Sequence, residues 1–222
     1  MITQEQLREL YLTDLQLPDT LHGRTDPKVK YLGSWKAIQS YYKHGTPIDL
    51  TGRTVWCWSD IHFGHANIIK YANRPFDNVD AMNDAMIRAY LDCVGPDDVV
   101  IWNGDIGFKS AGAINEILNR LPGYKIHVVG NHDMDRSGKL ATIDMDERHV
   151  CYVVNTDSVQ LLFTHYPMDK VPRNCHNLHG HIHQNISPHP WNTNICVEHT
   201  NYAPAKLDEL LPTINEKVRQ CR

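Results

Sequence analysis

The chain has 222 residues, a formal net charge of −4 and a hydrophobic fraction of 41%. This length fits one large domain, or one domain with an extension, and the composition is that of a globular protein. The net negative charge gives no general attraction for nucleic acid, and no apolar run is long enough to span a bilayer. The first residues lack the basic and apolar regions of a signal peptide, so we expect a cytoplasmic protein.

Residues 1–50 differ from the rest of the chain and are predicted to form a helical extension. The sequence TQEQ at residues 3–6 is a capping box, and apolar residues follow it at helical spacing. Ser34 is expected to cap a second short helix. Two short helices cannot bury a core of their own, so the extension should dock on the main domain, which is predicted at 51–222.

From residue 53 onward, strand and helix patterns alternate. Apolar runs predict strands at 53–59, 98–102 and 124–129. Amphipathic helices are expected between them, at 79–93 and 114–121. This order favours an α/β fold in which helices cover the sheets.

The second half of the domain reads mainly as strands. A hairpin is predicted from 148–154 and 158–164, and a late strand from 193–198. The last helix is expected over 207–214, where Pro212 should kink or divide it.

Polar residues follow each of the earlier predicted strands, where ligands gather in sheets of this kind. These residues are Asp60, His62, Asp105, Asn131, His132, Asp133 and His165. Asp60 and His62 are two positions apart, as are His181 and His183, and in an extended chain such pairs point the same way. Two pairs of this type can bind two ions about 3.5–4 Å apart.

The motifs DIH, GD, GNHD, a lone His and GHIH occur in this order along the chain. In this the chain resembles the calcineurin-like metallophosphoesterases, over about residues 54–211. The longer stretch DIHFGHANIIKYANRPF is similar to a bacterial and phage-associated branch of small phosphoesterases. The resemblance implies a four-layer αββα sandwich of two mixed sheets flanked by helices, with a dimetal site at the carboxyl-terminal rim of the strands.

The ligand pattern of the family implies one group of ligands for each of two divalent cations and one bridging carboxylate. The groups are Asp60, His62 and His183 for one cation, Asn131, His165 and His181 for the other, and Asp105 for both. Carboxylate and imidazole donors suit Mn²⁺, which we expect, with Fe, Zn²⁺ or Ni²⁺ as alternatives. Such a pair of cations makes hydroxide available from water at neutral pH.

The resemblance also places His132 beside the scissile phosphate as a general acid, with Asp133 orienting it. Two further residues are candidates for substrate binding. His65 either contacts substrate or caps the helix that contains Asn67. Arg74 either clamps a phosphate or forms a structural salt bridge.

The resemblance implies a hydrolase that acts on phosphate esters. The chain has GDIGF where protein serine/threonine phosphatases carry GDxVDRG, and GNHD in place of GNHE, so protein phosphatase activity is not expected. We expect a phosphodiesterase that acts on a nucleotide or a nucleic acid end. A phosphomonoesterase for a small molecule is the alternative. A non-catalytic scaffold of this fold comes third, because scaffolds tend to lose ligands and none is missing here.

Overall fold

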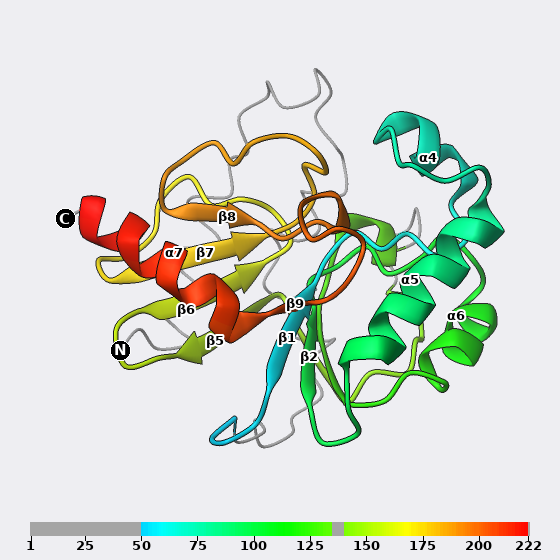
Figure 1. Cartoon of the computed structure of the whole chain (residues 1–222), viewed down its shortest axis with the longest axis horizontal. Coiled ribbons are helices and arrows are strands. Elements are labelled where there is room, and N and C mark those ends of the chain that lie inside the picture. The colour runs from blue at the N-terminus through cyan, green and yellow to red at the C-terminus, as the bar shows by residue number, and fades with distance from the viewer. Residues whose placement is uncertain (1–49, 135–139, 222) are drawn as a thin grey trace.

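The structure, a computed structural model, describes residues 50–134 and 140–221, and the helices predicted for the N-terminal extension lie outside these ranges. The described strands form two sheets, one of five strands and one of four (Figure 1). Helices pack beside both sheets, and the predicted α/β fold of two mixed sheets flanked by helices is confirmed.

The five-stranded sheet has the order β4-β3-β2-β1-β9. Its strands are β1 (Val55–Trp58), β2 (Val99–Trp102), β3 (Tyr124–Val128), β4 (Glu147–His149) and β9 (Ala205–Lys206). The first four run parallel, and β9 is antiparallel to β1. The parallel strands therefore end at one edge, where the predicted site residues follow them.

The four-stranded sheet has the order β5-β6-β7-β8. Its strands are β5 (Cys151–Asn155), β6 (Gln160–Thr164), β7 (Cys175–His179) and β8 (Asn192–Asn194). β5 and β6 form the predicted antiparallel hairpin, but Arg148 and His149, which were predicted to begin it, belong to β4 of the other sheet. β6, β7 and β8 are parallel. The strand β7 was not predicted, because its histidines and asparagine conceal an element whose residues are all buried.

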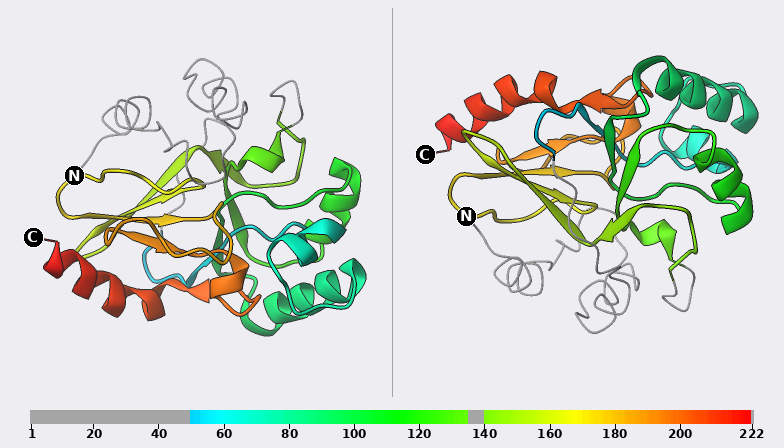
Figure 2. Two further views of the ribbon diagram at one scale, coloured as in Figure 1. Left: turned by 90° about the horizontal axis from the view of Figure 1, so that it is seen from above. Right: turned by 90° about the horizontal axis from the view of Figure 1, so that it is seen from below.

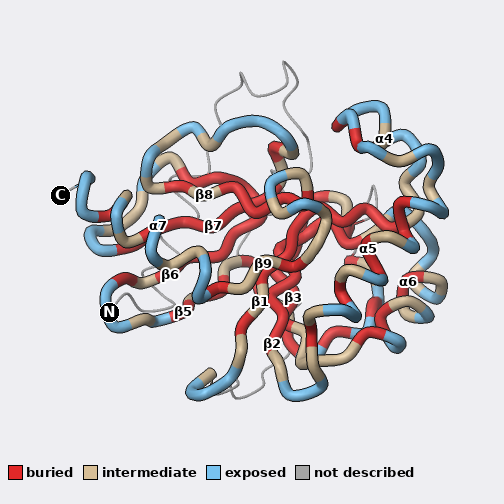
Figure 3. The backbone as a smooth tube through the Cα atoms, in the orientation of Figure 1, coloured by how far each residue is buried: buried red, intermediate tan, exposed pale blue. Residues whose placement is uncertain are grey.

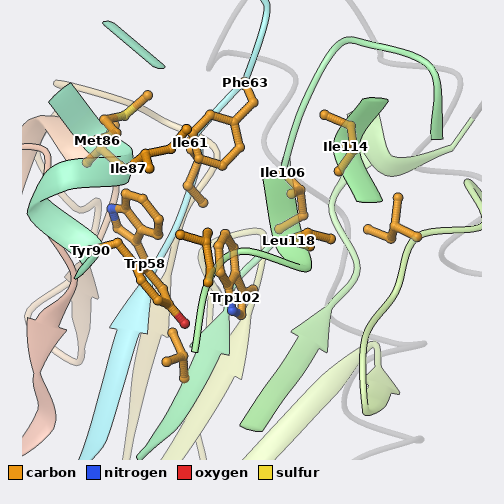
Figure 4. Packing of buried hydrophobic residues seen from close by; sticks show 14 of the residues in the cluster. Trp58, Ile61, Phe63, Met86, Ile87, Tyr90, Trp102, Ile106, Ile114 and Leu118 are labelled. Atoms are coloured by element: carbon orange, nitrogen blue, oxygen red, sulfur yellow. The ribbon is translucent and has the colours of Figure 1, made fainter. Parts of the chain in front are cut away.

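Side chains of the five-stranded sheet alternate between two cores, as the period of a strand requires. Cys57 and Ile101 lie in the core between the two sheets, together with Phe163 of β6. Trp58 and Trp102 lie in the core on the other face. Figure 4 shows these two rings packed together, with centroids 5.2 Å apart. Burial of such a side chain contributes up to about 3 kcal/mol.

Three helices lie on the outer side of the five-stranded sheet, at the side of the molecule away from the second sheet (Figure 2). They are α4 (Ala66–Tyr71), α5 (Val79–Cys93) and α6 (Ala111–Leu118). Asn78 caps α5 by accepting a hydrogen bond from the Ala81 amide at 2.9 Å. Two 3-10 turns, η1 (Asn131–Asp133) and η2 (Val197–His199), carry residues of the site.

The last helix, α7 (Leu207–Gln220), contacts β1, β9 and β7 and so bridges the two sheets. Of the two predicted effects of Pro212, a kink or a division, the division is wrong, because the helix continues through it. Leu207, Ile214 and Val218 are buried in the inter-sheet core on both sides of the proline. This shared apolar face offsets the hydrogen bond that a proline removes.

Burial follows the strands of both sheets, while exposed residues gather in the outer loops and on the outer helix faces (Figure 3). Among the described helices, none combines the length and the apolar character needed to cross a membrane.

Candidate metal centre

Side chains from the ends of β1 and β7 meet at the rim of the two sheets. The Nε2 atoms of His62 and His183 each lie 3.9 Å from Oδ1 of Asp60. The rings of the two histidines have centroids 5.2 Å apart. One predicted ligand group is therefore assembled, and it contains all three of its members.

Asp105, at the end of β2, lies between the two predicted ligand groups. Its Oδ2 atom is 3.5 Å from Nε2 of His62 and 3.4 Å from Nε2 of His165. Its Oδ1 atom accepts a hydrogen bond from the His132 amide at 2.7 Å. This is the position that a carboxylate shared by two cations would need.

Asn131 joins the second group. Its Oδ1 atom lies 3.0 Å from Nε2 of His165 and 3.1 Å from Nδ1 of His181. His181 and His183 were predicted to point the same way, but their side chains diverge. His181 turns to His165 and Asn131, and His183 turns to Asp60, which is the division that the family pattern implies.

Five of the predicted ligands have a left-handed backbone, which is uncommon for residues other than glycine. Their φ angles are 58° for Asp60, 58° for His62, 56° for Asp105, 69° for His181 and 48° for His183. The expectation of an extended chain at these residues is therefore wrong. The side chains converge because the chain turns sharply after β1, β2 and β7, at a cost of about 1–3 kcal/mol per residue. Strain of this kind is concentrated at functional sites.

Two glycines allow the loops to approach one another closely. A Cβ atom on Gly130 would overlap Oδ1 of Asp105, and one on Gly180 would overlap Ser59 Oγ and Asp60 Oδ2. Both positions therefore need glycine for the space it leaves.

The two oxygens of Asp60 have different surroundings. Oδ2 accepts hydrogen bonds from Ser59 Oγ at 2.6 Å and from the His181 amide at 2.9 Å, and Cys196 Sγ lies 3.2 Å away. Oδ1 is buried and has no hydrogen-bond partner among the described residues, and the same holds for Nε2 of His62. Donor atoms of one bound cation lie roughly 3–4 Å apart, since each is about 2 Å from it. The 3.9 Å between these two atoms fits a cation and is too long for a hydrogen bond.

The protonation states also suit cation binding. Burial lowers the pKa of His62 to about 3 and that of His181 to about 3, so both imidazoles are neutral and keep a lone pair for a metal. Burial raises the pKa of Asp60, but His165 and His183 outweigh it and bring the pKa to about 2. Burial lowers the pKa of His165, yet Asp105 and Asp60 raise it to about 10. Asp105 and Asp60 thus favour positive charge at this position, and a bound cation would take the place of the proton, because only a neutral imidazole offers a lone pair.

Asp133 has a different role from the predicted one. Its Oδ2 atom accepts hydrogen bonds from the amides of Asp105 and Gly130 at 2.9 and 2.8 Å, and lies 2.8 Å from Nε2 of His127. Its Oδ1 accepts from the Ile106 amide at 2.9 Å. The prediction that Asp133 orients His132 is wrong, because the carboxylate is buried behind the loops. It fixes the backbone that carries Asp105.

Arg74 is a structural residue, and the prediction that it binds a phosphate is wrong. Its buried guanidinium donates to the carbonyls of Ile61 and Asp60 at 2.9 and 2.6 Å. It also forms a salt bridge with Oε1 of Glu198, with Nη2 at 2.8 Å and Nε at 2.9 Å. The structural alternative considered for Arg74 is therefore the correct one, and no donor of this side chain faces solvent.

Glu198 is a member of the site that the sequence argument missed. Its Oε1 atom lies 3.2 Å from Nδ1 of His183, whose Nε2 faces Asp60. Carboxylates that accept from the second nitrogen of a ligand histidine fix its ring and its tautomer. The strand predicted at 193–198 is wrong in its second half, because β8 ends at Asn194 and Glu198 lies in η2. A signal was still present, since this carboxylate follows a predicted strand, as the other site residues do.

His132 and His65 lie at the open side of the centre. The side chain of His132 is 31% exposed, and its Nε2 atom is 4.0 Å from Oδ2 of Asp105. Nδ1 of His65 lies 3.3 Å from Nδ1 of His62. His65 precedes α4, but its side chain makes no capping hydrogen bond, so the capping alternative is wrong. Both side chains are partly exposed beside the two ligand groups.

The segment 175–183 contains two more histidines besides His181 and His183, and both are buried in β7. His176 lies 2.8 Å from Thr193 Oγ1, and His179 lies 2.9 Å from Ser187 Oγ. They connect the second sheet to its neighbouring segments and do not enter either ligand group.

Comparison with known proteins places the chain in a family. No model of a known protein family matches the sequence. The uncharacterized protein MJ1445 of Methanocaldococcus jannaschii is 32% identical over 175 residues, which cover 74% of this chain and 93% of that protein. The chain belongs to the same family as MJ1445.

A solved structure shows the same fold. The protein of unknown function AQ665 from Aquifex aeolicus is 25% identical, with a TM-score of 0.57. The match covers 72% of this chain and 99% of the AQ665 chain. YfcE, a phosphoesterase from E. coli, is 15% identical, with a TM-score of 0.36, over 64% of this chain and 78% of its own.

Proposed function

We propose that this protein is a metal-dependent phosphoesterase, and that its substrate is a phosphodiester of a nucleotide or a nucleic acid end. The observation that carries the proposal is a pair of donor sets at the rim of the sheets, all of whose members except His183 are buried. Asp60, His62 and His183 form one set, and Asp60, Asp105 and His165 another, with the donor atoms of each set within 4.8 Å of one another. The ordered motifs that supply these residues support the same reaction class.

The residues fit two divalent cations. Asp60, His62 and His183 would hold one, His165, His181 and Asn131 the other, and Asp105 would contact both. When bound, such cations act as Lewis acids toward phosphoryl oxygens and lower the pKa of water for attack on phosphorus.

The chain itself contributes three things to this reaction. Glu198 and the left-handed turns hold the donors in place before a substrate arrives, so little reorganisation is needed. Asn131 supplies a neutral oxygen, which leaves more positive charge for the substrate than a third carboxylate would. His132 reaches the open side, where its imidazole can donate a proton to the leaving oxygen.

The proposal is tested by metal analysis combined with a substrate panel. Purified protein is assayed with added Mn²⁺ against cyclic nucleotides, dinucleotides, aryl phosphodiesters and phosphomonoesters, before and after exhaustive chelation. We expect two ions per chain, hydrolysis of diesters above monoesters, and loss of activity on chelation that Mn²⁺ reverses. Full turnover by metal-free protein would contradict the proposal.

Asp105→Asn gives the internal control for that test. The change removes the charge that lies between His62 and His165, so at least one ion should be lost and the rate should fall. Asp92→Asn changes an exposed carboxylate of α5 and should alter neither. An Asp105→Asn protein with two ions and a normal rate would show that Asp105 is not shared between them.

A further inference from the structure

An aromatic side chain stands open at the edge of the metal centre. Phe108, three positions after Asp105, is 53% exposed. A single exposed Phe is ordinary on a protein surface, so exposure alone indicates nothing. Its neighbours make it unusual, because its ring contacts two histidines of the centre.

One face of the Phe108 ring is covered by His65. The two rings are stacked, with centroids 4.3 Å apart and an interplanar angle of 14°. His132 meets Phe108 edge-on, with centroids 5.2 Å apart and an angle of 61°. Since these contacts occupy one face and one edge, the remaining exposed area belongs to the opposite face of the ring.

The position of Phe108 is fixed relative to the donors. Its amide donates a hydrogen bond to the carbonyl of Phe63 at 2.8 Å, and Phe63 pairs with Gly107 in a short bridge. Phe63 follows His62 directly, so the same ladder of backbone bonds positions the main chain of Phe108 and two ligand loops. The ring of Phe108 is therefore attached to a segment that is anchored beside the donors.

Two further side chains extend this edge. Tyr71, at the end of α4, is 70% exposed, and its ring lies 6.3 Å from that of His65. The exposed side chain of Lys109 lies against Gly64, where a Cβ atom would overlap it. The edge therefore offers planar apolar surface with a positive charge beside it, which suits a planar base joined to an anionic group.

We propose that Phe108, backed by His65, binds the nucleobase of a substrate whose phosphate lies at the metal centre. The proposal rests on the phosphoesterase function above and names the feature of the substrate that the protein selects. Stacking of a base on an aromatic side chain tolerates any sequence, because each base has a π-face. The protein would then favour nucleotides over phosphate esters of the same charge that lack a base.

The test compares two ligands that differ only in the base. Calorimetry on the Mn²⁺-loaded protein measures binding of adenosine 5′-monophosphate and of ribose 5-phosphate. We expect the nucleotide to bind more tightly. Phe108→Ala should weaken nucleotide binding roughly tenfold and leave ribose 5-phosphate unchanged. Phe108→Trp, which keeps a stacking surface, should restore the preference. Leu91→Ala is the matched control, because Leu91 is 45% exposed on α5 and outside the centre.

Equal binding of the two ligands by the unaltered protein, or an equal loss for both in Phe108→Ala, would overturn the proposal. A 5′-phosphorylated dinucleotide identifies the source of the base. Tighter binding than the mononucleotide indicates a nucleic acid end, and equal binding a free nucleotide. Failure of the phosphoesterase function is recognised separately, since it would leave no ester hydrolysed while the binding preference is still measured.

Discussion

Glu198 connects His183 to Arg74 through a single oxygen atom. Oε1 lies 3.2 Å from Nδ1 of His183 and accepts from Nη2 of Arg74 at 2.8 Å. Arg74 in turn holds the carbonyls of Asp60 and Ile61. One buried ion pair therefore fixes a proposed metal ligand that follows β7 and the backbone of another that follows β1, across the junction of the two sheets.

Glu198→Gln should weaken metal binding without changing the ligands. The amide keeps the shape of the side chain but removes the charge that holds the His183 ring and its tautomer. Loss of such an outer contact costs about 10–100-fold in metal affinity, which titration with a competing chelator measures. Glu216→Gln, an exposed change on α7, is the control. Unchanged affinity in Glu198→Gln would mean that His183 needs no support from this carboxylate.

Arg74→Met should destabilise the fold by about 3–5 kcal/mol, because it leaves Glu198 buried without its partner. The free energy of unfolding is measured by urea titration in the presence of chelator, so that metal loss does not contribute. Arg88→Met, an exposed change on α5, should have little effect. If Arg74→Met kept its stability and only raised KM, the guanidinium would be a phosphate clamp after all.

The structural position of Arg74 and the central position of Asp105 show which parts of the site the sequence could predict. The family motifs named all the residues of the two groups, although the strand before His181 and His183 was not predicted. The motifs do not show whether the side chain of a neighbouring residue faces the metal centre or packs behind the loop. Arg74 and Asp133 both belong to the motifs, yet both point behind the loops, since their charges are satisfied by backbone groups that only the folded chain brings together. The side chain of Asp105, whose backbone is left-handed, faces His62 and His165 at the metal centre.

The strands, too, were predictable in part and unpredictable in part. The apolar runs at 53–59 and 98–102 placed two strands correctly, whereas the division of Cys57 and Trp58 between two cores is visible only in the structure. β7 was not predicted, because its polar side chains satisfy one another inside the protein, as His176 does with Thr193. A pattern based on hydrophobicity detects no strand in such a segment.

Gly180→Ala should disturb the centre by steric overlap alone. The added methyl group would overlap Ser59 Oγ and Asp60 Oδ2, which are both buried, so Asp60 must move. We expect metal affinity to fall about tenfold or more, as measured by elemental analysis after dialysis. Gly112→Ala is the matched control, because its methyl group would meet nothing within 4 Å. In that helix the change should stabilise by about 0.5–1 kcal/mol. Full metal content in Gly180→Ala would show that the loop can adjust.

His132→Gln tests whether this histidine donates a proton to the leaving oxygen. His132 lies beside the donors without belonging to either group, with its ring 5.3 Å from that of His62. A nitrophenolate leaves unaided at neutral pH, whereas a ribose alkoxide needs a proton, and general acid catalysis is worth about 10²–10⁴ in rate. The variant should lose about that factor on a nucleoside ester and much less on a nitrophenyl ester, with its metal content unchanged.

The control for this experiment is His189→Gln, which alters a histidine stacked on Trp191 and outside the centre. It should leave both rates unchanged. If His132→Gln loses the same factor on both esters while both ions are retained, His132 stabilises charge on the phosphoryl group and the proton comes from elsewhere. The leaving-group dependence thus separates the two roles, because only a proton donor matters more as the leaving oxygen becomes more basic.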